Sequence, residues 1–409
     1  MRRVVVVGAG LAGLAVSALL SRAGFSIVVV ESRRQAPQQE DSSRSINLAL
    51  SARGIRTLDE LGITREAMQS AVPMYGRRLH LPDGTEEFES YDLVGNNAIY
   101  SIRRSRLWKL LSDAAQASGV VIRYDASCVD VDAESRTVTL SDYDGRRSDL
   151  AFDALLGCDG AHSAVRRALG RSGAVATEMQ HIRHGYMELS FPRSKAQKLE
   201  PDGLHIWARK DHMLVALPNA DGSFAGTVFV PLEHEGSNRF QSKREQLLAV
   251  LEQHFADATE LVADLSGAVS KNPLCRLFAT RCDAWSHAGS VLLMGDAVHS
   301  MAPFYGQGMN CALEDCHVFM RCMERGRGDW PTVFADFERS RRPDTDAITN
   351  LSQANYREMS HHGLPNNHKL RREIERALQA RFPEACVPLY ALVSFQPSDP
   401  SAGIDEFAY

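Results

Sequence analysis

Short apolar runs alternate with amphipathic stretches through much of the chain, an order typical of α/β proteins. Residues 3–7 are an arginine followed by four valines, which predicts a buried parallel strand. Residues 11–23 have helical spacing and are ended by Gly24, and residues 26–30 are a β-branched run that leads to Glu31. The chain is therefore expected to open as strand, turn, helix, strand and acid.

The same patterns predict the elements that follow. Helices are expected over residues 45–61, 104–118 and 244–255, from about residue 308, and over residues 330–380 with breaks at Pro343 and at residues 363–365. Strands are expected over residues 120–124, 127–131, 137–140, 152–157, 185–191, 203–208, 212–218, 223–231 and 290–293. The strands after residue 176 are predicted to be antiparallel, so a β-rich part interrupts the opening pattern, which resumes near Ser290. This order predicts two interleaved lobes with a ligand cleft between them.

The turn after the first strand carries Gly8, Gly10 and Gly13, spaced as G-x-G-x-x-G. In this spacing the first glycine permits a tight turn, the second lets the backbone approach a pyrophosphate, and the third lets the helix pack closely on the strand. The helix start offers free N–H groups to phosphate oxygens, and Glu31 can accept hydrogen bonds from a ribose. The pattern predicts a dinucleotide site. An ordinary glycine-rich turn is the alternative, and the motif alone does not choose between FAD and NAD(P).

Composition and charge narrow the range of possible functions. The chain has 409 residues, of which 44% are hydrophobic and 24% charged, and its formal net charge of −5 argues against a nucleic-acid or membrane-surface role. The arginines of Arg339–Arg342 are expected to be a solvated helix end. There is no signal peptide pattern and no apolar run of about 18 residues. The eight cysteines include no C-x-x-C pair, so neither a metal site nor a disulfide framework is expected, and a cytoplasmic protein is predicted.

Two later motifs join the opening one. Gly157-Cys-Asp-Gly160 and Met294-Gly-Asp296 each follow a predicted strand, and Gly306-Gln-Gly-Met-Asn310 comes soon after the second. In this order the motifs resemble those of the class A flavoprotein aromatic hydroxylases. The resemblance implies FAD as the cofactor, with Asp159 near the flavin and the nicotinamide nucleotide and with Asp296 on the ribityl chain. The cofactor-binding residues that it implies are Gly8, Gly10, Leu11, Ala12, Gly13, Glu31, Arg104, Asp159, Asp296, Pro303, Gly306, Gln307, Gly308, Met309 and Asn310.

Longer motifs outside the cofactor site narrow the resemblance to the kynurenine 3-monooxygenase family. They are residues 44–51, 185–189, 204–207, 212–218, 303–310, 355–359 and 388–390, and the resemblance extends from Met1 to about Ser394. It implies that the amino-acid head group of kynurenine is held by Arg77, Tyr91, Asn355 and Tyr390. A guanidinium suits a carboxylate because it can bind both oxygens. Without the resemblance, Arg77 would read as a solvated strand charge and Tyr91 as an aromatic that packs in a hairpin. The implied apolar ring pocket is Ile206, Met213, Val215, Phe229, Phe304 and Met359.

The resemblance also implies a reaction. It predicts hydroxylation of L-kynurenine to 3-hydroxykynurenine with NADPH and O2 through a flavin hydroperoxide, with positioning residues and no side-chain acid or base. The same chemistry on a substituted kynurenine or another 2-aminobenzoyl compound is an alternative, and a non-catalytic flavin protein that binds a ligand is another. His205, His212 and His299 are expected to be structural. Family members usually continue with a further C-terminal segment, whereas this chain ends at Tyr409 with a tail unlike a membrane anchor.

The expected fold is α/β with an α+β insertion. A Rossmann-like FAD-binding domain is interleaved with an antiparallel-sheet substrate domain, and a helical C-terminal region follows. The FAD-binding domain is assigned residues 1–75, 99–176 and 282–345, the substrate domain residues 76–98 and 177–281, and the C-terminal region residues 346–409.

Overall fold

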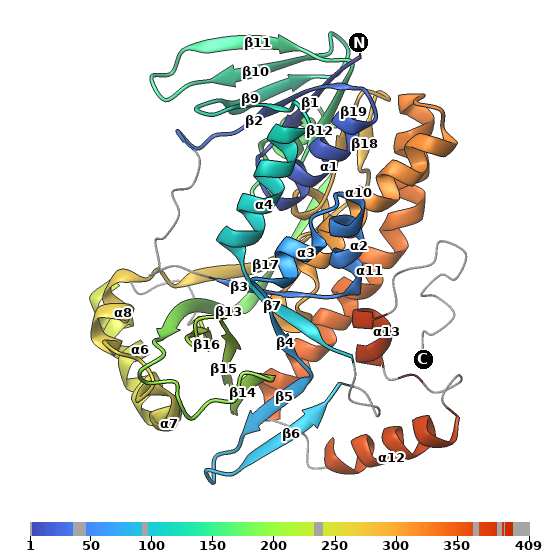
Figure 1. The fold of residues 1–409 in the computed structure, drawn as a ribbon. Helices are drawn as coiled ribbons and strands as arrows, with labels where there is room; N and C mark the ends of the chain where they lie inside the picture. The colour runs from blue at the N-terminus through green and yellow to red at the C-terminus, as the bar shows by residue number, and fades with distance from the viewer. Residues whose placement is uncertain are drawn as a thin grey trace.

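The computed structural model describes residues 2–35, 46–91, 97–232, 240–362, 368–382, 387 and 389–395. Two large sheets organise these residues, one built around the opening strand and one around the later β-rich part (Figure 1). Long helices lie beside them, and α11 runs along much of the molecule.

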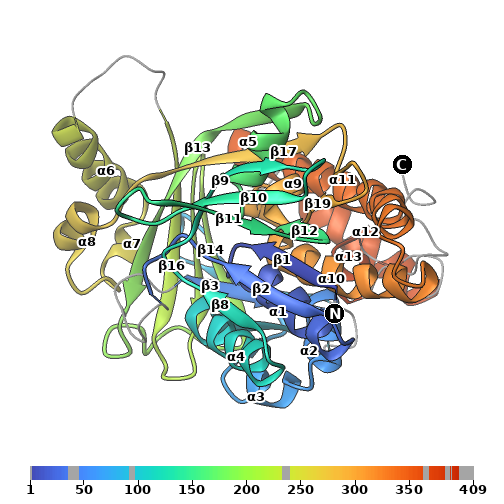
Figure 2. The ribbon, with the colours of Figure 1, turned by 90° about the horizontal axis from the view of Figure 1, so that it is seen from above.

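The first large sheet has six strands in the order β18-β19-β12-β1-β2-β8. Its strands are β1 Arg3–Val7, β2 Ser26–Val30, β8 Val121–Arg123, β12 Ala154–Gly157, β18 Ser286–His287 and β19 Val291–Leu293. All its pairings are parallel except that of β18 with β19. The valines of β1 are buried, as expected for a central parallel strand. Helix α1 (Leu11–Arg22) packs against α4 (Arg104–Ala117) and α10 (Gly308–Arg325), and Figure 2 shows α1 next to α4.

The second large sheet has seven strands in the order β17-β13-β16-β15-β14-β5-β6. Its strands are β5 Gly76–His80, β6 Glu86–Ser90, β13 Thr177–Phe191, β14 Gly203–Arg209, β15 His212–Pro218, β16 Phe224–Pro231 and β17 Cys275–Cys282. One face packs on α6 (Phe240–His254), α7 (Ala256–Thr259) and α8 (Leu265–Lys271) through a core that includes Phe191, Trp207, Leu251 and Phe255. Because side chains alternate along a strand, the strand residues next to Phe191 and Trp207 face away from these helices.

Two smaller sheets and further helices complete the described fold. One three-stranded sheet is β9 (Ser127–Asp132), β10 (Thr137–Ser141) and β11 (Arg147–Ala151), and another is β3 (Asn47–Leu50), β4 (Val72–Met74) and β7 (Ile99–Arg103). The remaining helices are α2 Ala52–Glu60, α3 Thr64–Met68, α5 Ala164–Arg171, α9 Asp296–His299, the 3₁₀ turn η2 Pro303–Tyr305, α11 Trp330–His362, α12 His368–Arg381 and α13 Leu389–Phe395. No helix in the described part of the chain is long and apolar enough to cross a membrane.

Two sequence predictions about secondary structure were wrong. The helix expected over residues 45–61 is a strand at Asn47–Leu50 followed by a helix from Ala52, because Asn47–Leu50 pairs with β7 and buries Leu50. The break expected at Pro343 is absent, and α11 continues through it. Phe337 before the proline and Ile348 after it are fully buried, so packing on both sides outweighs the one lost backbone hydrogen bond.

The predicted fold class agrees with this arrangement, since an α/β part with a mostly parallel sheet surrounds an inserted, mostly antiparallel sheet. Strands β5 and β6 leave the first part and join the second sheet, where β5 pairs in parallel with β14. We propose the predicted residue boundaries as the boundaries of the two domains.

Candidate functional site

A cavity of about 450 Å³ lies between the two large sheets. One end is lined by the glycine-rich turn and by the segment from Met294 to Ala312, and the other by strands of the seven-stranded sheet. Among the described lining residues only Arg77, Arg104 and Asp296 are charged, so most of the wall is apolar. The two ends therefore offer different chemistry.

The glycine-rich turn is packed so closely that side chains do not fit. Gly8 has φ of 104°, and a Cβ there would lie 2.6 Å from the carbonyl oxygen of Cys158. A Cβ on Gly13 would lie 2.0 Å from the carbonyl oxygen of Gly8. The predicted residues Gly10, Leu11 and Ala12 line the cavity, and no side chain caps the start of α1. Free N–H groups and close backbone approach are what a pyrophosphate needs, so this end fits a dinucleotide.

Glu31 lies at the end of β2, as predicted, with 7% of its surface exposed. It accepts hydrogen bonds from the Ala9 backbone N–H at 2.8 Å and from the Arg33 Nε at 3.1 Å. Burial raises the pKa of Glu31, but the bonds from Arg33 and Ala9 outweigh it and lower that pKa overall. The carboxylate is therefore a charged acceptor beside the first turn, the role expected at a ribose.

The segment from Asp296 to Met309 forms the opposite wall of this end. Asp296, Pro303, Gly306, Gly308 and Met309 all line the cavity, as does Arg104 from the start of α4. Burial raises the pKa of Asp296, while His299 and Arg104 act to lower it. The turn at Gly306 needs a left-handed φ of 69° before α10 begins at Gly308. A carboxyl group and a glycine-rich helix start fit the polyol and the ring system of FAD.

Three predicted cofactor residues lie just behind the wall. Asp159 Oδ2 accepts hydrogen bonds from the backbone N–H of Ala164 at 2.6 Å and of Val165 at 3.1 Å, at the start of α5. Asn310 is fully buried, accepts from Ser51 N–H at 2.9 Å and donates to the carbonyls of Ala49 and Gly306. Gln307 is also buried, beside Ser51. The side chains of Asp159, Gln307 and Asn310 hold the loops that line the cavity.

The predicted head-group residues come together at the other end. The Arg77 Cζ lies 4.5 Å from the ring centroid of Tyr390, and the rings of Tyr390 and Tyr91 stack at 4.8 Å. Asn355 Nδ2 donates to the carbonyl of Phe304 at 2.6 Å. Arg77, Asn355 and Tyr390 line the cavity, and Tyr91 lies behind Tyr390.

The electrostatics of this end favour an anion. Burial acts to lower the pKa of Arg77, but the neighbouring Tyr390 and Tyr91 outweigh it, so its pKa is raised and it stays a cation. Burial raises the pKa of Tyr91 well above its usual value, so its hydroxyl stays neutral. That hydroxyl lies against Tyr390 and Arg77. A buried cation beside neutral tyrosine hydroxyls fits a ligand carboxylate.

The predicted ring pocket also forms. Ile206, Met213, Val215, Phe229 and Phe304 line the cavity, and the rings of Phe229 and Phe304 lie 5.1 Å apart. The side chain of Met359 lies outside the described residues.

Sequence reasoning did not assign several further wall residues to the site, among them Tyr186, Leu204, Leu277 and Tyr305. Tyr186 lies directly opposite Phe229 on the neighbouring strand, so strand alternation could have placed it once the pairing was known. Tyr305 directly follows the predicted Phe304 within η2.

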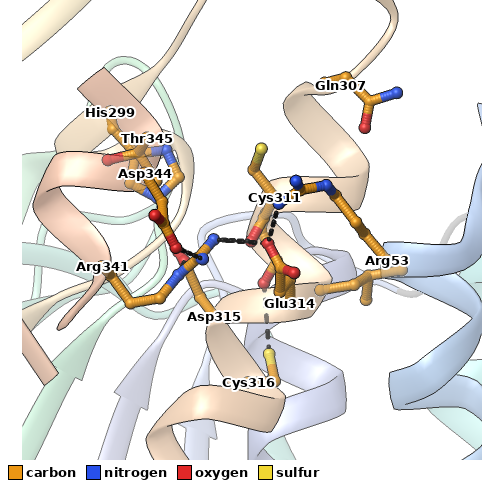
Figure 3. Close-up of polar contacts among 12 residues, drawn as sticks. Arg53, His299, Gln307, Cys311, Glu314, Asp315, Cys316, Arg341, Asp344 and Thr345 are labelled. Atoms are coloured by element: carbon orange, nitrogen blue, oxygen red, sulfur yellow. Dashed lines mark hydrogen bonds and ion pairs between the residues drawn. The ribbon is translucent and has the colours of Figure 1, made fainter. Parts of the chain in front are cut away.

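A buried polar network lies beside the cofactor end (Figure 3). Asp315 accepts from Arg341 Nε at 2.8 Å, from His299 Nε2 at 2.6 Å and from the backbone N–H of Gly295 at 3.0 Å. Arg341 also pairs with Glu314 at 3.0 Å. Arg341 is fully buried, so its expected place on a solvated helix end was wrong, because three carboxylates on the described helices compensate its charge.

The His299–Asp315 pair predicts a pH-dependent stability. Burial acts to lower the pKa of His299, but Asp315 outweighs it, so the pKa is raised above its unfolded value of about 6.5. A raised pKa stabilises the fold fully at pH values below the pKa of the unfolded state. This contribution is lost as the pH rises through the pKa of the folded state. The difference in melting temperature between wild type and His299→Gln should therefore be largest near pH 6 and shrink at higher pH. A difference that stays constant from pH 6 to pH 9 would contradict this assignment.

One group among the described residues brings possible metal ligands together: His80, Glu86 and His205. His80 Nε2 lies 2.8 Å from His205 Nδ1, whereas Glu86 lies 3.7 Å from the other ring nitrogen of His80. Glu86 also pairs with Arg78. His205 also contacts the Glu200 carbonyl through its other ring nitrogen, so both of its nitrogens already have protein partners.

Comparison with known proteins places the chain among flavoproteins. The FAD binding domain family model matches residues 1–329. The chain is 34% identical to a kynurenine 3-monooxygenase of Flavobacterium psychrophilum over 99% of this chain and 92% of that protein. It is 36% identical to the enzyme of the same name from Stenotrophomonas maltophilia, over 96% of this chain and 87% of that protein. The match to the one from Dictyostelium discoideum is 32%, over 96% and 88%.

Solved structures share the fold at lower identity. A tetrameric 2-methyl-3-hydroxypyridine-5-carboxylic acid oxygenase superposes with a TM-score of 0.74 at 20% identity, covering 99% of this chain and 98% of that one. A tetracycline destructase superposes with a TM-score of 0.71 at 19% identity, covering 98% and 99%. These likenesses confirm the predicted fold class, and the family match confirms FAD as the predicted cofactor.

Proposed function

This chain belongs to the kynurenine 3-monooxygenase family, and on that premise we propose that it is an FAD-dependent monooxygenase that converts L-kynurenine to 3-hydroxykynurenine with NADPH and O2. The observation that carries the proposal for this chain is the single cavity that joins a dinucleotide end to a buried Arg77. L-Kynurenine needs both a site for its carboxylate and an apolar slot for its ring.

The head-group end supports recognition of an amino acid. We propose that Arg77 binds the carboxylate, because a buried guanidinium can donate two charge-assisted hydrogen bonds to it. Tyr390 and Asn355, which line the cavity, add directed polar contacts, and the neutral hydroxyl of Tyr91 supports Tyr390 and Arg77 from behind. The Asn355 amide is held by its bond to the Phe304 carbonyl, so it is positioned before a ligand arrives.

The apolar residues position the ring. Phe229 and Phe304 form adjoining walls, and Ile206, Met213 and Val215 come from two neighbouring strands of the same sheet. Bound FAD, reduced by NADPH, supplies the activated oxygen atom for the reaction. The aniline nitrogen of kynurenine makes the ring carbon beside it nucleophilic, so the side chains need only hold that carbon in place and keep water out.

We propose that no side chain acts as an acid or base on the substrate ring. Among the described residues that line the cavity, Asp296 is the one carboxylate, and it lies at the cofactor end. We propose that Asp296 and the N–H groups at the start of α1 hold FAD and that the ring pocket acts by positioning. The seven described cysteines are free, which supports a cytoplasmic location within this proposal.

Oxygen and NADPH consumption test the proposal. The purified protein should carry FAD, and L-kynurenine should stimulate NADPH oxidation and oxygen uptake in equal amounts. A protein that binds flavin and ligand without turnover would show no stimulation. Stimulation by a ring-substituted kynurenine and none by L-kynurenine would reassign the substrate and leave FAD in place.

A further inference from the structure

Arg53 on α2 makes a contact that ties the last described helix to the body of the protein. Its Nε donates to the backbone carbonyl of Val393 at 2.8 Å, and its Nη1 pairs with Glu314 at 2.8 Å. Arg53 is 2% exposed, so both contacts are made away from water. Figure 3 shows its side chain reaching from α2 toward Glu314 on α10.

The carbonyl that Arg53 binds belongs to the last turn of a short helix. The described α13 runs from Leu389 to Phe395, and the carbonyls of a last helical turn lack partners within the helix. Such carbonyls also carry the partial negative charge of the helix dipole, which a cation stabilises. A seven-residue helix is marginal by itself, so α13 depends on tertiary contacts of this kind.

The first turn of α13 contributes to the head-group end of the cavity. Tyr390 lies in its first turn, stacks on Tyr91 at 4.8 Å and lies 5.5 Å from the ring of Tyr305. Tyr390 is also the residue of α13 that lines the cavity. These stacking contacts fix the position of the Tyr390 ring only if α13 itself is held in place.

Arg53 is itself held in place. Glu314 is shared between Arg53 and Arg341, and Arg341 pairs further with Asp315, so buried charges of both signs surround the guanidinium. Arg53 is followed directly by Gly54, where a Cβ would lie 2.7 Å from Asn310 Oδ1, so α2 and α10 are packed closely at this point. The Arg53 guanidinium, which caps the end of α13 by binding the Val393 carbonyl, is therefore itself held in place by tightly packed helices.

We propose that Arg53 is a positioning residue for substrate binding. It docks α13 through the Val393 carbonyl and thereby sets the place of Tyr390 beside Arg77. It touches neither substrate nor cofactor. This inference rests on the proposed function, because it takes Tyr390 to be part of the site that binds L-kynurenine.

Arg53→Met tests the inference in the full-length holoenzyme. The substitution keeps the apolar volume and removes the cap, and it leaves Glu314 paired with Arg341, so no buried charge loses its last partner. We expect the dissociation constant for L-kynurenine to rise at least tenfold and amide exchange over Leu389–Phe395 to accelerate, while the affinity for FAD stays within twofold. In a Tyr390→Phe background, Arg53→Met should raise the dissociation constant for L-kynurenine less, because both substitutions act through the Tyr390 hydroxyl.

Arg22→Met is the matched control. Arg22 on α1 also donates to carbonyls at a helix end, those of Glu60, the last residue of α2, and of Leu61 after it, at 3.2 and 3.0 Å. This control should leave both kynurenine affinity and exchange over α13 unchanged. If Arg53→Met retains wild-type kynurenine affinity, or retains wild-type exchange over α13, the inference is overturned.

The two measurements separate this inference from the proposed function. If the wild-type protein does not bind L-kynurenine, the proposed function fails. The exchange experiment then decides the docking role alone: accelerated exchange over α13 in Arg53→Met, with none in Arg22→Met, supports it, and unchanged exchange refutes it.

Discussion

Arg77→Ala is expected to weaken L-kynurenine binding by about 1.5–3 kcal/mol, roughly 10- to 150-fold, while the FAD content of the purified protein stays normal. The reason is that Arg77 is the one cation among the described residues that line the head-group end, where it lies against the Tyr390 ring. Its removal takes away the charge-assisted hydrogen bonds to the carboxylate and leaves that anion in a buried apolar site. Titration of binding by flavin absorbance or fluorescence measures the change.

The neighbouring arginine provides a matched control. Arg78 is next along β5, points to the opposite face of the sheet and pairs with Asp202 at 2.7 Å and with Glu86. Arg78→Ala removes the same charge from the same strand but from outside the cavity, so kynurenine affinity should stay near that of the wild type. Equal losses in both variants would mean that Arg77 acts through the strand, and unchanged affinity in Arg77→Ala would remove it from the site.

Gly13→Ala is expected to abolish FAD binding and to lower the free energy of unfolding by about 3 kcal/mol. The added Cβ would lie 2.0 Å from the carbonyl oxygen of Gly8 and 3.3 Å from the Cβ of Cys158. Relief requires α1 to move away from β1, and that movement displaces the turn whose N–H groups are to hold the pyrophosphate. Alanine occurs at this third position in some dinucleotide-binding proteins, so the prediction follows from the packing of this chain. Flavin content and chemical denaturation measure the two effects.

Gly170→Ala is the control for this substitution. Gly170 also lies in a helix, α5, and, its chain neighbours and its own helix backbone aside, a Cβ there would come no closer than 3.6 Å to any atom, the nearest being the carbonyl oxygen of Val175. The variant should keep its FAD and be at least as stable as the wild type, because alanine favours helix over glycine. Retention of FAD in Gly13→Ala at wild-type stability would refute the packing argument.

Local pattern was sufficient for much of the fold. The valines of β1, the glycine spacing and the β-branched β2 each specify one element, and their order specifies the parallel sheet. The pairing of β5 with β14 was beyond this reasoning, because strands over a hundred residues apart in the chain meet only through the tertiary fold. Pro343 was misleading for a related reason, since propensity describes an isolated helix and α11 is packed on both sides of the proline.

The candidate site divides in the same way. The glycines and the aspartate of Met294-Gly-Asp296 are typical of cofactor binding in their local sequence, whereas Arg77 and Tyr390 entered only through the family resemblance. Arg53 and Arg341 were not identified at all as buried residues, because a charged side chain in an amphipathic helix is usually solvated. Their burial depends on carboxylates supplied by other helices, which no short window of sequence contains.

Product analysis tests the central claim most directly. The FAD-loaded protein is incubated with L-kynurenine, NADPH and isotopically labelled O2, and the products are separated and weighed by mass spectrometry. The account predicts 3-hydroxykynurenine that carries one labelled oxygen atom, formed in a one-to-one ratio with NADPH consumed. NADPH consumption that yields only hydrogen peroxide, or no product from L-kynurenine at all, would contradict the claim that this cavity positions kynurenine for hydroxylation.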